Sequence, residues 1–251
     1  MRTKVIAGNW KMNNDIAQST ELINGLKAAL AGASPKATVV ICPPYTSLGL
    51  AQQLIAGSVI KLGAQDVSLH DSGAFTGEVS VGMLKSVGCT YVIVGHSERR
   101  QFHAETNEII NQKAKKVLAG GLLPIICVGE TLQEREQNIT DTVLTTQTTG
   151  VLTGLTAAEV EKSIVAYEPV WAIGTGKTAT KEQADQAHVV IRSVIASLYS
   201  KETAEKVVIQ YGGSVKADNA VELLSQPNID GALVGGACLK ADSFAAIIAA
   251  A

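Results

Sequence analysis

The sequence has no cysteine pattern that would form a metal site or a disulfide framework. Its four cysteines, Cys42, Cys89, Cys127 and Cys238, lie far apart, and no CxxC pair or Cys/His cluster occurs among the 251 residues. Isolated cysteines in apolar segments are usually buried, reduced thiols of cytoplasmic proteins. We therefore expect no structural zinc, no disulfide framework and a cytoplasmic location.

Long apolar runs and an excess of positive charge are also missing. No apolar stretch approaches the ~20 residues that cross a bilayer, and polar residues from Asn9 onward interrupt any signal-peptide core. The formal net charge of -2 offers no basic surface for nucleic acid. Neither a membrane protein nor a nucleic-acid-binding protein is expected.

Two nucleotide-binding motifs are incomplete. The first predicted turn reads Gly8-Asn9-Trp10-Lys11, which is not the GxGxxG of a dinucleotide-binding fold. Residues 174–178 end like a P-loop, but the full pattern requires glycine where Trp171 stands. We therefore expect no P-loop nucleotide site.

Short apolar segments alternate with helical patterns along the whole chain. Several of these segments are β-branched and lack clear alternation, as parallel strands covered on both faces do. Capping boxes that begin at Thr131, Thr156 and Thr180 predict helix starts. The predicted strands are Val5–Trp10, Thr38–Cys42, Ile60–Gln65, Tyr91–Val94, Leu123–Val128, Ile164–Tyr167, Val207–Tyr211 and Gly231–Val234.

Eight strand–helix units without a linker predict an α/β protein with one (β/α)8 barrel domain over residues 1–251. An open doubly wound sheet is the alternative, but it usually has fewer strands and often a glycine-rich first turn. In a barrel, the C-terminal ends of the strands converge on the face where active sites lie. The residues that directly follow each strand are therefore the candidates for chemistry.

The sixth predicted strand is followed by Glu168 and an unusual segment. Pro169 cannot donate to a sheet, so the strand should end there. Residues 169–177 combine small residues, two glycines and the large apolar Trp171 ahead of the helix that Thr180 caps. This pattern favours a reactive carboxylate beneath a movable cover. A solvated glutamate in a surface loop is the alternative.

Polar residues follow two other strands. Asn9 and Lys11 come after the first strand, and His96 follows the apolar run that ends at Val94. Because a helix should begin near Ser97, its dipole would oppose a positive charge on His96 and keep the ring neutral between about pH 5 and 8. The alternatives are a histidine that only satisfies a strand end and an ordinary surface lysine.

Glycines follow the last two strands, in Gly212-Gly213-Ser214 and in Gly235-Gly236. Barrels frequently bind phosphate with the loops after strands seven and eight, and glycine lets backbone N–H groups approach the anion. Two such turns together favour a phosphate site, although tight turns without a ligand would leave the same pattern.

Taken with these residues, the sequence resembles the triosephosphate isomerase family. Two positions depart from the family's habit, namely Asp66, where asparagine is common, and Cys238, where serine is common; neither should touch the chemistry. The matching stretches occur in the family's order and are Gly8–Asn13, Ser72–Glu78, Val94–Arg100, Ala166–Lys177, Tyr211–Val215 and Gly231–Ala237.

The resemblance implies an enzyme of glycolysis and gluconeogenesis that interconverts dihydroxyacetone phosphate and glyceraldehyde 3-phosphate through an enediolate, without cofactor or metal. It implies that Glu168 is the base and that neutral His96 polarises the carbonyl. Lys11 would stabilise negative charge and Asn9 would position the substrate. Ser97, Glu98 and Cys127 stand where the family has secondary active-site residues, and the phosphate would bind to amides of Gly174, Ser214, Gly235 and Gly236.

The resemblance also implies a lid and a symmetric homodimer. The long loop of residues 65–78 would place Thr76 in a neighbouring subunit near Lys11. The lid would consist of Pro169, Val170, Trp171, Ala172, Ile173, Gly174, Thr175, Gly176 and Lys177.

Two other functions have to be weighed against this one. Another phosphate-binding barrel enzyme, such as a sugar-phosphate epimerase, would share the glycine turns, but the lid sequence and the set of Asn9, Lys11 and His96 argue against it. A non-catalytic metabolite-binding barrel would need no complete set of base, electrophile and cation.

Overall fold

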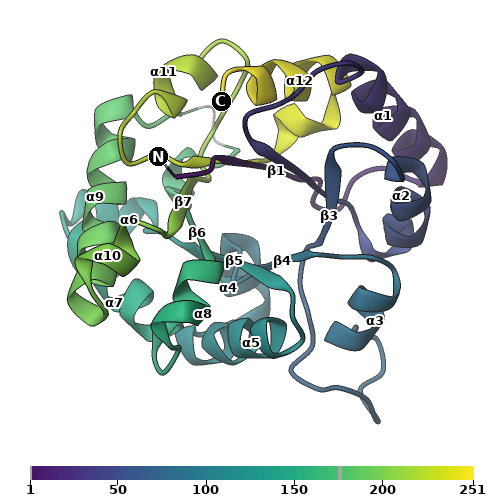
Figure 1. Ribbon diagram of the computed structural model, residues 1–251. Coiled ribbons are helices and arrows are strands. Elements are labelled where there is room, and N and C mark those ends of the chain that lie inside the picture. Colours follow the sequence, from purple (N-terminus) through teal and green to yellow (C-terminus); the bar gives the residue numbers. More distant parts are fainter. Residues whose placement is uncertain (1, 175–176) are drawn as a thin grey trace.

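A closed barrel of parallel strands forms the centre of the molecule. The computed structural model describes residues 2–174 and 177–251. Within them, eight strands pair in chain order and the last pairs with the first, while the helices form a ring outside (Figure 1). The predicted (β/α)8 barrel is confirmed. The strands are β1 (Val5–Asn9), β2 (Thr38–Cys42), β3 (Ile60–Ala64), β4 (Tyr91–Val94), β5 (Leu123–Val128), β6 (Ile164–Tyr167), β7 (Val208–Tyr211) and β8 (Gly231–Val234).

Three strand boundaries differ by one residue from the prediction. Trp10 still donates its N–H to Cys42, but Lys11 turns into a left-handed conformation and β1 ends at Asn9. The side chain of Gln65, rather than its backbone, makes the contacts to β2, so β3 ends one residue earlier. The N–H of Val207 bonds back to Thr203, so β7 begins at Val208.

Several helices begin at residues whose side chains cap them. The capping boxes at Thr131, Thr156 and Thr180 are confirmed, and Asp15 caps a further helix in the same way. None of the described helices is both long and apolar enough to cross a bilayer. The helices are α1 (Ile16–Ala29), α2 (Leu48–Ile55), α3 (Val81–Ser86), α4 (Ser97–His103), α5 (Asn107–Ala119), α6 (Leu132–Glu136), α7 (Thr140–Leu152), α8 (Ala157–Lys162), α9 (Lys181–Leu198), α10 (Lys201–Ala204), α11 (Ala220–Leu224) and α12 (Ala241–Ala249), with 3₁₀ turns η1 (Tyr45–Ser47), η2 (Val170–Ala172) and η3 (Gly236–Leu239).

The core has two layers because alternate strand residues point to opposite faces. The larger layer lies between strands and helices. The smaller layer fills the barrel itself, so the barrel is a packed core with its site at one end. The inner residues are Val5, Ala7, Val40, Cys42, Ile93, Ile125, Cys127, Ile164, Ala166 and Leu233. All four cysteines are free and buried, and burial raises the pKa of each thiol.

The loop after β3 projects from the barrel wall (Figure 1). Near its tip, Phe75 is 41% exposed and stacks on His70 at 3.6 Å between ring centroids. The base of the loop is held by charge. Asp66 lies 2.7 Å from Lys113 and 3.0 Å from Arg99, and Glu105 joins the same two cations at 2.5 and 2.6 Å. This closed ring of four charges ties the loop to α4 and α5. Within it, Asp66 has a structural role as the partner of Lys113 and Arg99.

Candidate active site

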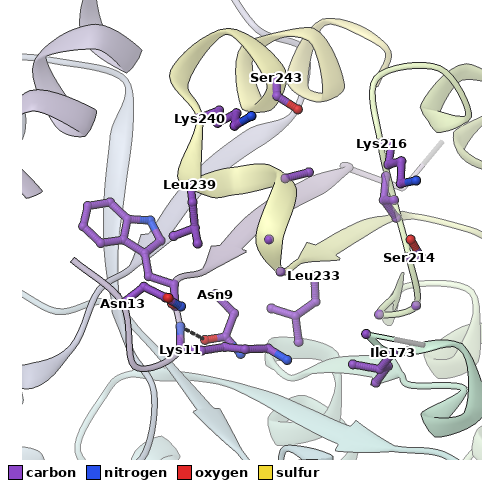
Figure 2. A pocket seen from close by; sticks show the side chains of 18 of the residues that line it. Asn9, Lys11, Asn13, Ile173, Ser214, Lys216, Leu233, Leu239, Lys240 and Ser243 are labelled. Atoms are coloured by element: carbon purple, nitrogen blue, oxygen red, sulfur yellow. Dashed lines mark hydrogen bonds between the residues drawn. The ribbon is translucent and has the colours of Figure 1, made fainter. Parts of the chain in front are cut away.

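A cavity of about 830 Å³ opens at the C-terminal ends of the strands (Figure 2). Every residue that the sequence predicted as catalytic or phosphate-binding lines it. These residues come from β1, the β4 end, the β6 end and the turns after β7 and β8, and they are Asn9, Lys11, His96, Glu168, Gly174, Ser214, Gly235 and Gly236.

Lys11 reaches the cavity from a strained backbone. Its φ of 54° is left-handed, which costs a non-glycine residue roughly 1–2 kcal/mol. Two contacts hold it: Asn9 Oδ1 accepts the Lys11 N–H at 3.0 Å, and Gln65 Nε2 donates to the Lys11 carbonyl at 2.8 Å. The same Gln65 nitrogen donates to Cys42 O at 2.9 Å, so it fixes the turn to β2. In Figure 2 the Lys11 side chain extends across the cavity toward Ile173.

The Lys11 ammonium is paired inside the site. Its Nζ lies 2.5 Å from Glu98 Oε1, which holds the flexible side chain in one place. Glu98 belongs to the first turn of α4, directly after His96 and Ser97. The predicted secondary residue Glu98 therefore connects the lysine that follows β1 to the histidine that follows β4.

His96 caps helix α4 with its ring. Its Nδ1 accepts the N–H of Glu98 at 3.2 Å, which places the ring proton on Nε2. Nε2 lies 2.8 Å from Glu168 Oε1, and the histidine is only 6% exposed. Gly95 precedes it at φ 70°, and a Cβ there would come within 2.5 Å of Ile110. Glycine is therefore needed to turn the chain from β4 into the cap.

The charge of His96 depends on a group that the sequence could not place beside it. Burial lowers the pKa of His96, but the facing Glu168 carboxylate outweighs burial and raises the pKa above its ordinary 6.5. The expectation of a neutral ring took only the helix into account. In the structure, the Glu98 N–H bound to Nδ1 still disfavours protonation of His96, whereas the Glu168 carboxylate favours it.

We expect the substitution Glu168→Gln to lower the pKa of His96. The variant loses the carboxylate that raises the pKa, while burial and the Glu98 N–H continue to disfavour the charged ring. Nitrogen-15 NMR of the ring should show titration shifted to lower pH than in the parent protein, with the Nε2–H form above about pH 6.5. Identical titration curves for the two proteins would contradict the role of the carboxylate.

Glu168 is a buried but ionised carboxylate. It is 2% exposed, and its Oε2 accepts the N–H of Ser97 at 2.8 Å. Burial raises its pKa, but His96, the Ser97 amide and Lys11 together outweigh burial, so its pKa is lowered from 4.5. A carboxylate that keeps its negative charge at neutral pH in a dry site can act as a base.

Two glycines let the backbone pack directly around Glu168. A Cβ at Gly129 would lie 1.7 Å from the Glu168 carbonyl oxygen, and a Cβ at Gly212 would lie 2.9 Å from Glu168 Cγ. The N–H of Glu168 donates to Val128 O at 2.7 Å. Glu168 is therefore held between the ends of β5 and β7, with no side chain separating the backbones.

The first part of the predicted lid is hydrogen-bonded to the buried carboxylate of Glu130. Glu130 Oε1 accepts the indole N–H of Trp171 at 2.8 Å and the hydroxyl of Tyr167 at 3.0 Å. The Arg135 guanidinium lies 5.1 Å from the centroid of the Trp171 ring. Ile173 and Gly174 line the cavity, Lys177 is described, and the predicted lid residues 175 and 176 lie outside the described residues. Glu130 was not among the residues predicted from the sequence, although it also follows the end of a strand.

The glycines after β8 leave open space. A Cβ at Gly236 would meet no atom within 4 Å, and one at Gly235 would meet only Lys11 Cε, at 3.7 Å. Packing within the protein therefore does not require glycine at these positions, whereas close approach of a ligand to the backbone would. Gly213 differs, because a Cβ there would lie 2.2 Å from the Tyr211 hydroxyl.

The remaining predicted residues lie just behind the cavity. Ser97 contributes its backbone N–H to Glu168, as described, and Cys127 is fully buried in β5. Arg100, which the sequence analysis did not single out, donates to Gly95 O at 3.1 Å and to Cys127 O at 3.0 Å, tying the ends of β4 and β5 together. Among the described residues, no group of three or more His, Cys, Asp or Glu is arranged to hold a metal ion.

Fold and cavity define the class: a (β/α)8-barrel with a carboxylate, an imidazole and a lysine in one cavity at its C-terminal mouth. The model of the triosephosphate isomerase family matches residues 4–251. The chain belongs to this family.

Proteins named triosephosphate isomerase match along essentially their whole length. The one from Chlorobium phaeovibrioides is 52% identical over 251 residues, with 100% of both chains covered. That of Rhodopirellula baltica is 53% identical over 250 residues, covering 100% of this chain and 98% of its own. That of Clostridium novyi is 49% identical over 248 residues, covering 99% and 98%.

Proposed function

We propose that this protein interconverts dihydroxyacetone phosphate and D-glyceraldehyde 3-phosphate by proton transfer, without a cofactor. The observation that carries the proposal is the approach of Glu168 Oε1 to His96 Nε2 at 2.8 Å, in the cavity that Lys11 also lines. Full-length relatives that bear the name of this activity support it. The compartment would be the cytoplasm and the pathways glycolysis and gluconeogenesis, with residues 1–251 acting as one domain.

In this mechanism, Glu168 removes a proton from the carbon next to the carbonyl. The electrons of the broken C–H bond move to the carbonyl oxygen, where His96 Nε2–H donates a hydrogen bond and then a proton. His96 then takes the proton of the neighbouring hydroxyl, whose oxygen becomes the new carbonyl, and Glu168 returns its proton to the former carbonyl carbon, which completes the isomerisation. Because Glu168 Oε1 and His96 Nε2 lie 2.8 Å apart, the substrate would have to separate them before both can act on it.

Lys11 and the glycine turns would supply the electrostatic part of catalysis. The Lys11 ammonium would stabilise the negative charge of the enediolate, and Asn9 would orient the substrate oxygens. The phosphate would accept from the amides of Ser214, Gly235 and Gly236, with the Gly174 amide joining when residues 169–177 close over the site. These donors all border the same cavity.

A coupled assay with D-glyceraldehyde 3-phosphate tests the function. We expect turnover with kcat/KM in the enzymatic range of about 10⁴–10⁸ M⁻¹s⁻¹. Turnover of a pentose phosphate instead would favour the epimerase alternative. Binding of triose phosphate without turnover would favour a non-catalytic barrel.

We further propose a symmetric homodimer in which the loop of residues 65–78 docks beside Lys11 of the neighbouring subunit. Supporting this, the loop projects from the barrel, Phe75 is 41% exposed, and Met12, next to Lys11, is 96% exposed. The exposed Thr76 at the tip of the loop would make the contact. Sedimentation should give a dimer at micromolar concentration, and a fully active monomer would refute the proposal.

A further inference from the structure

We propose that Gln147, on helix α7, is a positioning residue for the general base, because it holds the Gly129 peptide against which the Glu168 backbone packs. The inference rests on the proposed function, since it takes Glu168 to be the base. Gln147 does not line the cavity, and its role would be exerted through Gly129.

One side-chain amide serves both backbone groups of Gly129. Gln147 Oε1 accepts the Gly129 N–H at 2.8 Å, and Gln147 Nε2 donates to the Gly129 carbonyl at 3.1 Å. β5 ends one residue earlier, at Val128. Gln147 therefore continues the hydrogen bonding of the sheet beyond the strand, as the backbone of a neighbouring strand would.

Gly129 has little freedom to move without moving Glu168. A Cβ added to Gly129 would lie 1.7 Å from the Glu168 carbonyl oxygen and 3.1 Å from Glu168 Cα, so the two backbones are in direct contact. On either side, Val128 O accepts the N–H of Glu168 at 2.7 Å, and Glu130 O accepts the N–H of Val170 at 3.0 Å. A shift of Gly129 is therefore transmitted to the base and to the start of the lid.

The geometry at the other end of Glu168 is sensitive to such a shift. Its two carboxylate oxygens lie 2.8 Å from His96 Nε2 and 2.8 Å from the Ser97 nitrogen. Displacing the backbone changes at least one of these distances. Misplacement of a catalytic group by about 1 Å, caused by a change remote from the reacting atoms, costs on the order of 10² in rate.

Helix α7 itself is fixed independently of Gln147. Its inner face is formed by residues that are buried against the barrel, Leu144, Thr148, Val151 and Leu152. Gln147 is only half-buried. Replacing it should therefore leave the helix in place and release mainly the Gly129 peptide.

The first test is the substitution Gln147→Leu, which is similar in size and removes both hydrogen bonds. We expect kcat for triose phosphate to fall at least about tenfold. KM should stay within about twofold, because the phosphate-binding turns follow β7 and β8. Wild-type kcat in the folded variant would overturn the inference, whereas absence of isomerisation by the parent protein would remove the proposed function itself.

Asn111→Leu is the matched control. Asn111 Nδ2 donates to Val151 O at 2.8 Å and to Thr153 O at 3.0 Å, at the far end of the same helix. This variant also loses two hydrogen bonds to backbone, yet none of them touches the site. We expect its melting temperature to fall with kcat preserved. An equal loss of kcat in both variants would show that Gln147 is merely structural.

The substitution Gln147→Glu tests whether lowering the pH restores kcat. A protonated carboxyl group offers one acceptor and one donor, as the amide does, whereas the ionised form repels the Gly129 carbonyl. The kcat of the variant relative to the parent should therefore rise as pH falls through roughly 6 to 4, the range in which such a carboxyl titrates. A ratio independent of pH would contradict the inference, and this readout does not depend on the leucine variant being stable.

Discussion

Replacing Glu168 by glutamine is expected to lower kcat at least about 10²-fold while the barrel stays folded. The amide keeps the shape of the side chain and retains an oxygen for the Ser97 N–H, but it cannot accept a proton from carbon. KM should change much less, since the glycine turns that we propose to bind the phosphate are untouched. The measurement is steady-state turnover of D-glyceraldehyde 3-phosphate, with circular dichroism to confirm folding.

A suitable control removes a carboxylate elsewhere on the barrel. Glu161 pairs with Lys206 on the surface, at 3.1 Å, so Glu161→Gln makes the same chemical change outside the site. We expect its turnover to match that of the parent protein. Near-normal turnover in correctly folded Glu168→Gln would show that another group is the base.

Deleting residues 173–176 is expected to abolish most isomerisation with little change in melting temperature. The described part of this segment, Ile173 and Gly174, lines the cavity and adds little to the core. The anchor of Trp171 on Glu130 lies before the deletion. Without the cover, water enters the site and weakens the stabilisation of the enediolate.

The deletion should also change the product. In an uncovered enediolate, the electron pair can expel the phosphate from the neighbouring carbon, breaking its C–O bond and leaving an enol that becomes methylglyoxal. We would measure methylglyoxal and triose phosphate side by side, together with calorimetry. Unfolding of the variant would make the segment structural, and lost turnover without methylglyoxal would limit the lid to substrate binding.

A double variant checks the origin of the methylglyoxal. Combining the deletion with Glu168→Gln removes the base that forms the enediolate, so methylglyoxal should fall to the rate of the substrate alone in buffer. Continued production at the rate of the single deletion would show that the enediolate does not arise through Glu168.

The sequence was sufficient for those parts of the site that depend on strand ends. A parallel barrel brings the residues at and after the ends of its strands together. The sequence alone could therefore predict that Asn9, Lys11, His96 and Glu168 lie in one site. The same rule applied to β5 would have found Glu130, which follows Val128 by two residues.

Contacts between distant segments could not be predicted in this way. Gln147 lies in a helix where a glutamine normally marks a solvated face, and nothing in its pattern indicates that it bonds to Gly129. Gln65 and Arg100 also act on backbone carbonyls of segments far away in the chain. The pKa of His96 was misjudged for the same reason, since the group that raises it follows another strand.

The close approach of Glu168 to His96 has a consequence for which ligands the site selects. Glu168 Oε1 lies 2.8 Å from His96 Nε2. A substrate with an acidic C–H beside a carbonyl would offer a proton to Glu168 and an acceptor to His96, and part of its binding energy would then be used to separate the two side chains. Selection among phosphorylated compounds would thereby be coupled to their ability to react.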